Sequence, residues 1–161
     1  MSVSFINKLF KSKSNDDFCT AVVLAAGNSQ RMGKDKILMP LGGAPVIAHT
    51  LKALQSAECI DEIVVVTKYE RLQELADICH DHGISKASKV VVGGKTRLES
   101  SLIGVSNADE RAKYIAIHDG ARPFVTNSLI ERVVHSAHQH GASAPAVSAT
   151  DLSLIHISEP T

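Results

Sequence analysis

Four short apolar runs recur along the chain, and each is followed by a stretch with helical periodicity. The runs are rich in Val and Ile and do not alternate with polar residues, which is typical of strands covered on both faces. Between them, apolar residues recur every three or four positions, as on one face of an amphipathic helix. The predicted strands span residues 20–26, 61–68, 88–94 and 114–120, and the predicted helices span residues 45–57, 70–83, 97–108 and 127–141.

Finer features of the pattern give three further predictions. Residues 142–149 are short, apolar and alanine-rich, and they predict a fifth strand. Ser128 and Glu131 have the spacing of a capping box at the start of the last helix. In the helix over residues 97–108, the aligned apolar side chains are expected to face the core; they are Leu98, Leu102 and Val105.

The alternation of strands and helices predicts an α/β fold of three layers. Buried strands in βα order form a mostly parallel sheet with helices on both sides, so we expect a Rossmann-like α/β/α domain. Ligands of such sheets bind outside the carboxyl ends of the strands. The residues that follow each strand are therefore the place to look for chemistry.

Three loops at those strand ends carry glycines, cations and a carboxylate. They span residues 27–36, 93–97 and 118–123. Glycine lets backbone N–H groups approach an anion closely, and Arg and Lys supply positive charge. A Walker loop and a dinucleotide fingerprint both have other glycine spacings, so neither an ATPase nor an NAD dehydrogenase is indicated. For the first loop alone, a plain strand-to-helix turn stays an alternative.

Composition narrows the possible partners and the compartment. The 161 residues carry 17 basic and 17 acidic side chains, a balance that argues against binding nucleic acid by bulk charge. No apolar run approaches 18 residues, so no membrane segment is expected. The three cysteines share no metal-ligand spacing and fit a reducing cytoplasm. His80 and His82 end a predicted helix, where the helix dipole favours surface histidines over a metal site.

Three segments resemble the 2-C-methyl-D-erythritol 4-phosphate cytidylyltransferases of non-mevalonate isoprenoid biosynthesis. They read "AAGNSQRMGKDK", "GGKTRLESSL" and "HDGARPF", and the resemblance extends from residue 20 to residue 151. It implies a nucleotidyltransferase domain that uses CTP and Mg²⁺ and releases CDP-methylerythritol and pyrophosphate. The opening segment occurs across the wider nucleotidyltransferase superfamily, whereas the "HDGARP" block is more specific.

The resemblance also implies roles for individual residues. Arg31 and Lys36 match the two catalytic cations, and Asp119 matches a carboxylate near the ribose, the metal and the incoming phosphate. Asp35 stands where the family often has proline, so Lys34 is an alternative to Lys36. The positions expected to bind nucleotide or substrate are Ala25, Ala26, Gly27, Asn28, Ser29, Gly94, Lys95, Arg97, Ser100, Asp119, Gly120, Ala121 and Arg122.

The residue types suit phosphoryl chemistry without a general base. A phosphomonoester with a second pKa of about 6 is already a nucleophile at neutral pH, so catalysis needs mainly positioning and charge neutralisation. Two alternatives stay open: a cytidylyltransferase for another polyol phosphate such as ribitol 5-phosphate, and a nucleotide-binding fragment without catalysis. A parent protein fused to a second enzyme is also compatible with the sequence.

The two ends of the chain depart from the resemblance. Residues 1–19 are expected to form a flexible arm, and residues 20–151 the nucleotidyltransferase domain. Residues 152–161 read "LSLIHISEPT" and look like foreign, read-through sequence that replaces the family's remaining part. On this interpretation the chain itself has little activity, while the full-length parent is an active, homodimeric enzyme.

Overall fold

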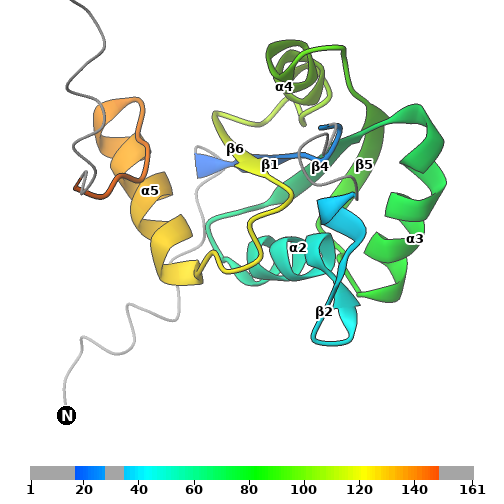
Figure 1. Ribbon diagram of the computed structural model, residues 1–161. Coiled ribbons are helices and arrows are strands. Elements are labelled where there is room, and N and C mark those ends of the chain that lie inside the picture. Colours follow the sequence, from blue (N-terminus) through cyan, green and yellow to red (C-terminus); the bar gives the residue numbers. More distant parts are fainter. Residues whose placement is uncertain (1–16, 28–34, 149–161) are drawn as a thin grey trace, which may run out of the picture.

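A central sheet of four parallel strands organises the protein (Figure 1). The computed structural model describes residues 17–27 and 35–148. Within this part, the strand order is β5-β4-β1-β6. The strands are β1 (Cys19–Leu24), β4 (Glu62–Thr67), β5 (Ala87–Val92) and β6 (Tyr114–Asp119). All four lie where the apolar runs predict them.

Strand β1 occupies the centre and pairs on both sides in parallel register. Leu24, its last residue, pairs with Val66 of β4 and with Asp119 of β6. Because the strands run in the same direction, their carboxyl ends meet at one edge of the sheet. The three predicted loops, which follow β1, β5 and β6, therefore leave the sheet at the same edge.

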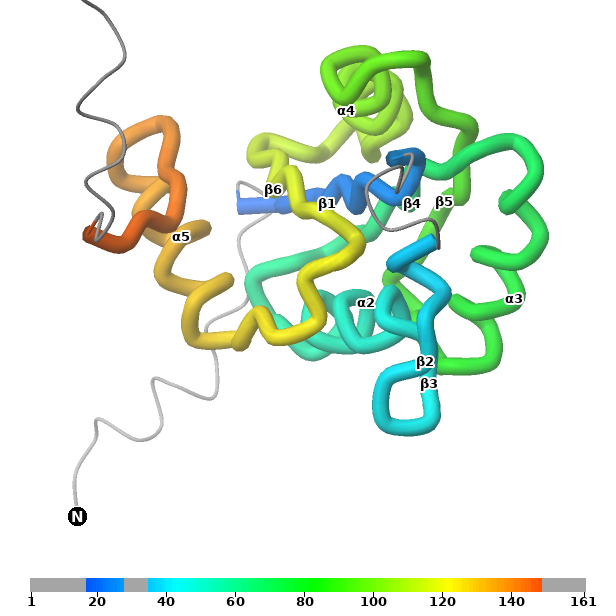
Figure 2. Tube along the Cα trace, in the orientation of Figure 1, coloured from blue at the N-terminus to red at the C-terminus, as the bar shows by residue number. Residues whose placement is uncertain are grey.

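Helices cover both faces of the sheet, as the α/β/α prediction requires (Figures 1 and 2). Helix α4 (Arg97–Ser106) packs on one face, against β1, β4 and β5. The other face is covered by α2 (Val46–Ser56), α3 (Leu72–Asp81) and α5 (Asn127–His140). The two layers of helices bury the apolar runs of the strands from both sides.

The two faces of the sheet have cores of unequal size. Alternate residues of β1 point to opposite faces, so Val23 joins the larger core and Val22 the smaller one. The larger core includes Ile47 and Leu51 of α2, both fully buried. The smaller core, under α4, is centred on three buried valines, Val22, Val64 and Val66.

The segment between β1 and α2 has structure that the hydrophobic pattern does not predict. It contains the short 3-10 helix η2 (Lys36–Leu38) and a two-stranded antiparallel ribbon, β2 (Pro40–Leu41) and β3 (Ala44–Pro45). Gly42 and Gly43 turn the ribbon with φ angles of 54° and 87°, a region that favours glycine. A second 3-10 helix, η3 (Tyr69–Arg71), leads into α3.

The prediction for the buried face of α4 is wrong. Leu98, Leu102 and Val105 are 69%, 58% and 39% exposed, whereas the helix contacts the sheet through Ser100, Ser101 and Gly104. A Cβ atom on Gly104 would lie 2.2 Å from Cγ1 of Val22. The helix therefore packs so close to β1 that only small side chains fit between them.

Two further predictions about the carboxyl-terminal part are wrong. Residues 142–148 form no strand and are exposed, and Pro145 among them has no N–H group to donate to a ladder. Helix α5 is capped by Thr126, whose hydroxyl accepts from the backbone N–H of Leu129 at 3.3 Å. The cap thus lies two residues before Ser128, the residue that the capping-box spacing indicated.

Glu62 of β4 is a buried carboxylate. It is 6% exposed and accepts hydrogen bonds from the hydroxyls of Thr20 and Ser88 and from the backbone N–H of Asp109. Burial raises the pKa of Glu62, but these hydrogen bonds outweigh it, so the pKa lies below its usual value. The carboxylate ties β4 to β1, to β5 and to the loop before β6.

The close packing of α4 can be tested at Gly104. We expect Gly104→Ala to lower the free energy of unfolding by about 1–3 kcal/mol, because the added methyl group overlaps Val22. Alanine is the better helix former by about 1 kcal/mol, so helix propensity alone predicts the opposite sign. Urea unfolding measures the change, with the exposed Ser106→Ala as a control. A Gly104→Ala protein of equal or greater stability would contradict the close contact.

Candidate functional site

Backbone hydrogen bonds extend the sheet beyond its strands and fix the three predicted loops at one edge. The first residue after each of β1, β5 and β6 donates its N–H group to a carbonyl of a neighbouring strand. The donor–acceptor pairs are Ala25–Val66 at 2.7 Å, Gly93–Thr67 at 2.7 Å and Gly120–Leu24 at 2.9 Å. The described starts of the three loops therefore lie at one edge, where the sheet holds their backbone.

The first loop is described at its two ends. Ala25 is buried, Ala26 is half-buried and Gly27 is exposed at the sheet edge. The predicted residues Asn28, Ser29, Arg31 and Lys34 lie outside the described residues. Their roles stay predictions.

Lys36 is placed by the residues on either side of it. It is the first residue of η2, and Ile37, which follows it, is buried in the larger core. Asp35 caps η2 by accepting from the backbone N–H of Ile37 at 3.4 Å. The same carboxylate pairs with the guanidinium of Arg71 at 2.9 Å.

Two glycines let the second loop pass close to its neighbours. A Cβ atom on Gly93 would lie 2.9 Å from the Cβ of Ala26, so the second loop touches the first. A Cβ atom on Gly94 would lie 2.3 Å from the Cβ of Glu99. The backbone N–H of Gly94 donates to the hydroxyl of Ser100 at 3.2 Å. Gly94 and Ser100, both expected to bind nucleotide or substrate, are thus in contact.

The N-terminus of α4 is already occupied by an acidic side chain. The carboxylate of Glu99 accepts from the backbone N–H groups of Lys95 and Thr96, at 2.6 and 3.2 Å. The Thr96 hydroxyl accepts from the N–H of Glu99 in return, which completes a capping box. Because these donors have acceptors, this loop suits a neutral group with donors of its own better than a phosphate.

Asp119 brings two predicted arginines together at the third loop. Its Oδ1 pairs with Arg97 of α4 at 3.1 Å, and its Oδ2 pairs with Arg122 at 3.0 Å. Burial raises the pKa of Asp119, but the hydrogen bonds from Arg122 and Arg97 outweigh it, so the pKa lies below its usual value. Asp119 is therefore an anion at neutral pH and joins the second and third loops.

Thr50 and Arg71 support the site, and the sequence patterns do not reveal them. The hydroxyl of Thr50, buried in α2, donates to the carbonyl of Gly120 at 2.9 Å. Arg71 belongs to η3, which follows β4, and reaches Asp35 across the sheet edge. Both act through contacts distant in sequence, so no local motif marks them. Ala121, also predicted in the third loop, is exposed beside Gly120.

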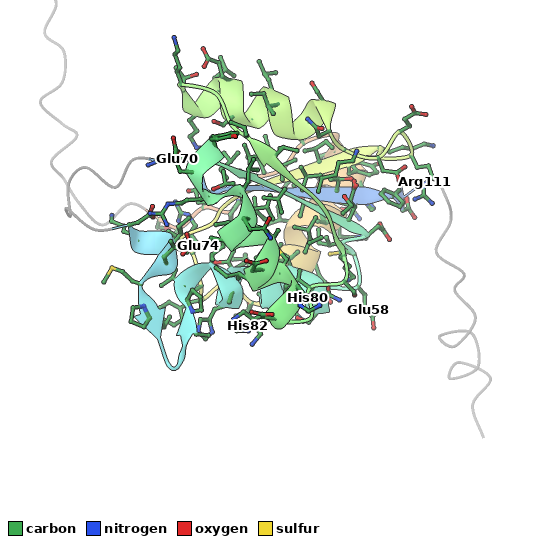
Figure 3. All side chains as sticks on the ribbon, turned by 90° about the vertical axis from the view of Figure 1, so that its right-hand side faces the viewer. Glu58, Glu70, Glu74, His80, His82 and Arg111 are labelled. Carbon is green, nitrogen blue, oxygen red and sulfur yellow. The ribbon has the colours of Figure 1, made fainter. Side chains whose placement is uncertain are left out.

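The two histidines at the end of α3 differ in exposure. Figure 3 labels His80 and His82 near the carboxyl end of this helix. The His80 side chain is 90% exposed and lies 3.2 Å from the carboxylate of Asp81. His80 is therefore a surface residue, as its position in the sequence predicts, whereas His82, the C-cap, is half-buried.

The described residues offer a single carboxylate, not a cage, for a metal ion. Across residues 17–27 and 35–148, no group of three or more His, Cys, Asp or Glu side chains is placed to hold one. Mg²⁺ commonly keeps several waters and takes one or two carboxylates together with substrate phosphates. Asp119, half-exposed at the sheet edge, fits that role, although its oxygens also bind Arg97 and Arg122.

Comparison with known proteins identifies relatives of the whole described region. A family model described as 2-C-methyl-D-erythritol 4-phosphate cytidylyltransferase matches residues 19–158. The protein of that name from Clostridium botulinum (strain Langeland) is 36% identical over 134 residues, which are 82% of this chain and 58% of the relative. That from Prosthecochloris aestuarii is 35% identical over 143 residues, covering 81% and 59%. The chain thus spans less than two thirds of the length of these relatives.

A solved structure with a similar fold is that of a protein with a related name. It is the 4-diphosphocytidyl-2C-methyl-D-erythritol synthase from Anaerococcus prevotii, with a TM-score of 0.66 and 26% sequence identity. The match covers 78% of this chain and 52% of that one. The arrangement of β1, β4, β5 and β6 with their helices is therefore that of a known nucleotidyltransferase fold.

The pairing at Asp119 gives a direct spectroscopic prediction. We expect Arg97→Ala and Arg122→Ala each to raise the pKa of the Asp119 carboxyl, because each removes a guanidinium that stabilises its charged form. Carboxyl-carbon NMR across a pH titration measures the shift. Arg111→Ala is the matched control, because Arg111 pairs with Asp109 instead. An Asp119 pKa that is unchanged in both variants would contradict the observed pairing.

Proposed function

Because the chain belongs to the 2-C-methyl-D-erythritol 4-phosphate cytidylyltransferase family, we propose that it carries the nucleotide-binding part of an enzyme that transfers CMP from CTP to 2-C-methyl-D-erythritol 4-phosphate. The observation that carries the proposal is the meeting of three loops at one sheet edge, each with the residues that the family motifs require. The products would be CDP-methylerythritol and pyrophosphate.

The triphosphate and the base would use different loops. The first loop, with Gly27 and the cations Arg31 and Lys36, supplies the positive charge that a triphosphate needs. The second loop is better suited to cytosine, because Glu99 already occupies the N-terminus of α4. The carbonyl of Gly94 can accept from the amino group of the base, and Ser100 holds this part of the backbone.

The reaction forms one bond and breaks another at the same phosphorus atom. An oxygen of the acceptor phosphate attacks the α-phosphorus of CTP, and the bond from that phosphorus to the bridging oxygen breaks to release pyrophosphate. At neutral pH the acceptor is largely dianionic, so no side chain has to remove a proton. Arg31 and Lys36 would stabilise the charge that builds on the phosphoryl oxygens and the leaving group.

Asp119 would orient the other ligands of the reaction. A bound Mg²⁺ would neutralise phosphate charge, and Asp119 is the described carboxylate that fits as its protein ligand. Arg97 and Arg122 hold this carboxylate charged and fixed at the end of β6. Their own exposed guanidinium groups add positive charge at the entrance of the site, where a second phosphorylated substrate must approach CTP.

A cytoplasmic location and a homodimer of the full-length protein complete the proposal. The cysteines Cys19, Cys59 and Cys79 form no disulfide, which fits a reducing compartment. Among the described helices, none has both the length and the apolar character needed to cross a membrane. The dimer is an expectation from the family resemblance.

Release of pyrophosphate from CTP tests the proposed activity. With the full-length parent protein and Mg²⁺, we expect release with 2-C-methyl-D-erythritol 4-phosphate and far less with ribitol 5-phosphate. Equal or faster release with ribitol 5-phosphate would favour the alternative acceptor. CTP binding by calorimetry without release from either acceptor would favour the non-catalytic fragment. A chain that binds no CTP would contradict all three functions.

Substitution of the two predicted cations tests their role in the transition state. We expect Arg31→Ala and Lys36→Ala each to lower turnover by about 100-fold or more, because each removes a charge aimed at the reacting phosphates. Lys34→Ala decides between the two lysines: the larger loss marks the one that faces the α-phosphate. Lys52→Ala, on the exposed side of α2, is the control. Wild-type turnover in both cation variants would exclude these residues from the mechanism.

A further inference from the structure

Asp35 and Arg71 form a shielded ion pair beside Lys36. The distance between Oδ2 of Asp35 and Nη2 of Arg71 is 2.9 Å, and the two side chains are only 17% and 25% exposed. By contrast, the pairs at Asp119 involve arginines that are 66% and 71% exposed. Ion pairs shielded from water are screened less than exposed ones, so this pair constrains its surroundings more strongly.

The pair connects two segments that leave the same edge of the sheet. Arg71 ends η3, which begins two residues after β4, whereas Asp35 lies between β1 and α2. The second terminal nitrogen of Arg71, Nη1, binds the carboxylate of Glu74 on α3 at 3.1 Å. One guanidinium thus holds Asp35 while it is itself held to the first turn of α3.

Lys36 has a fixed residue on each side. Asp35 is bound through its side chain to Arg71, and Ile37 is 6% exposed in the larger core. The Asp35 carboxylate also accepts from the N–H of Ile37, which closes the turn around Lys36. The direction in which the Lys36 side chain leaves the backbone is therefore set by these two anchors.

The charge of Asp35 adds an electrostatic reason for the pair. A carboxylate next to a lysine that must bind a triphosphate repels that ligand and competes for the lysine. The Arg71 guanidinium removes this effect by satisfying the carboxylate with a partner of opposite charge. Asp35 can therefore cap the turn before Lys36 while Arg71 neutralises the negative charge of its carboxylate.

We propose that Arg71 is a positioning residue for Lys36: it fixes Asp35, neutralises its charge, and so presents Lys36 to the phosphates of the nucleotide. The inference rests on the proposed function only in assigning Lys36 to CTP. Arg71 is not a catalytic residue on this proposal, because it acts through Asp35. The competing possibility is that Arg71 itself contacts a phosphate.

The anchoring is tested first without ligand. In Arg71→Ala, we expect the amide of Ile37 to exchange with solvent at least about tenfold faster by NMR, because its acceptor is released. Amides in the middle of α3, such as those of Leu75 and Cys79, should keep their rates. An Ile37 amide with unchanged exchange would overturn the anchoring, whether or not the chain binds CTP.

CTP binding tests whether Arg71 acts by neutralising Asp35. The four proteins compared are the wild type, Arg71→Ala, Asp35→Asn and the double variant. We expect Arg71→Ala to weaken the binding of CTP with Mg²⁺ at least about tenfold, and Asp35→Asn to have an effect below about threefold. In the double variant, binding should return to within about threefold of Asp35→Asn alone, because the uncompensated carboxylate is gone. If the loss from Arg71→Ala is equally large in both backgrounds, Arg71 contacts the phosphate directly and the proposal is wrong.

Further variants separate the positioning role from general damage to the fold. Arg71→Lys keeps one charge for Asp35 and should recover most of the binding that Arg71→Ala loses. Arg111→Ala removes an arginine–aspartate pair at the opposite end of the protein from Glu74, as Figure 3 shows, and should leave binding unchanged. Failure of wild-type protein to bind CTP would contradict the proposed function, while the exchange experiment would still decide the anchoring.

Discussion

The hydrogen bonds that continue the sheet past the ends of β1, β5 and β6 are the constraint on which the candidate site depends. Ala25, Gly93 and Gly120 each donate to a carbonyl of an adjacent strand, so three loops distant in sequence begin at the same edge of the sheet. Parallel register requires all three to leave on the same side. Backbone geometry thus places Gly27, Gly93, Gly94 and Asp119 at one edge of the sheet.

Ion pairs then divide this edge into regions of different charge. Asp119 is held between Arg97 and Arg122, and Asp35 is held by Arg71, so each carboxylate is compensated by at least one guanidinium. At the second loop the carboxylate of Glu99 is bound by backbone N–H groups instead of a guanidinium, so these donors are already occupied. A ligand with a highly charged end and a neutral end is suited to such a division, and a nucleoside triphosphate has that form.

The sequence predicts most of the fold because the strands are apolar and regularly separated by helical stretches. The same periodicity fails for α4: Leu98 and Leu102 indicate its core face, but close approach to Val22 selects the small face with Gly104 instead. The loops at the edge follow from strand order. The partners of Asp119 and Asp35 do not, since Arg97 and Arg71 meet them only once the sheet has assembled.

The capping of α4 by Glu99 has a consequence for inhibitor chemistry. The N-terminus of a helix commonly binds a phosphate or carboxylate through its unpaired N–H groups. Here the N–H groups of Lys95 and Thr96 already have an acceptor, and an added acid would face the carboxylate of Glu99. Compounds aimed at this loop should therefore carry a neutral or cationic donor, such as an amine or amidine, and keep their acidic groups for the first loop.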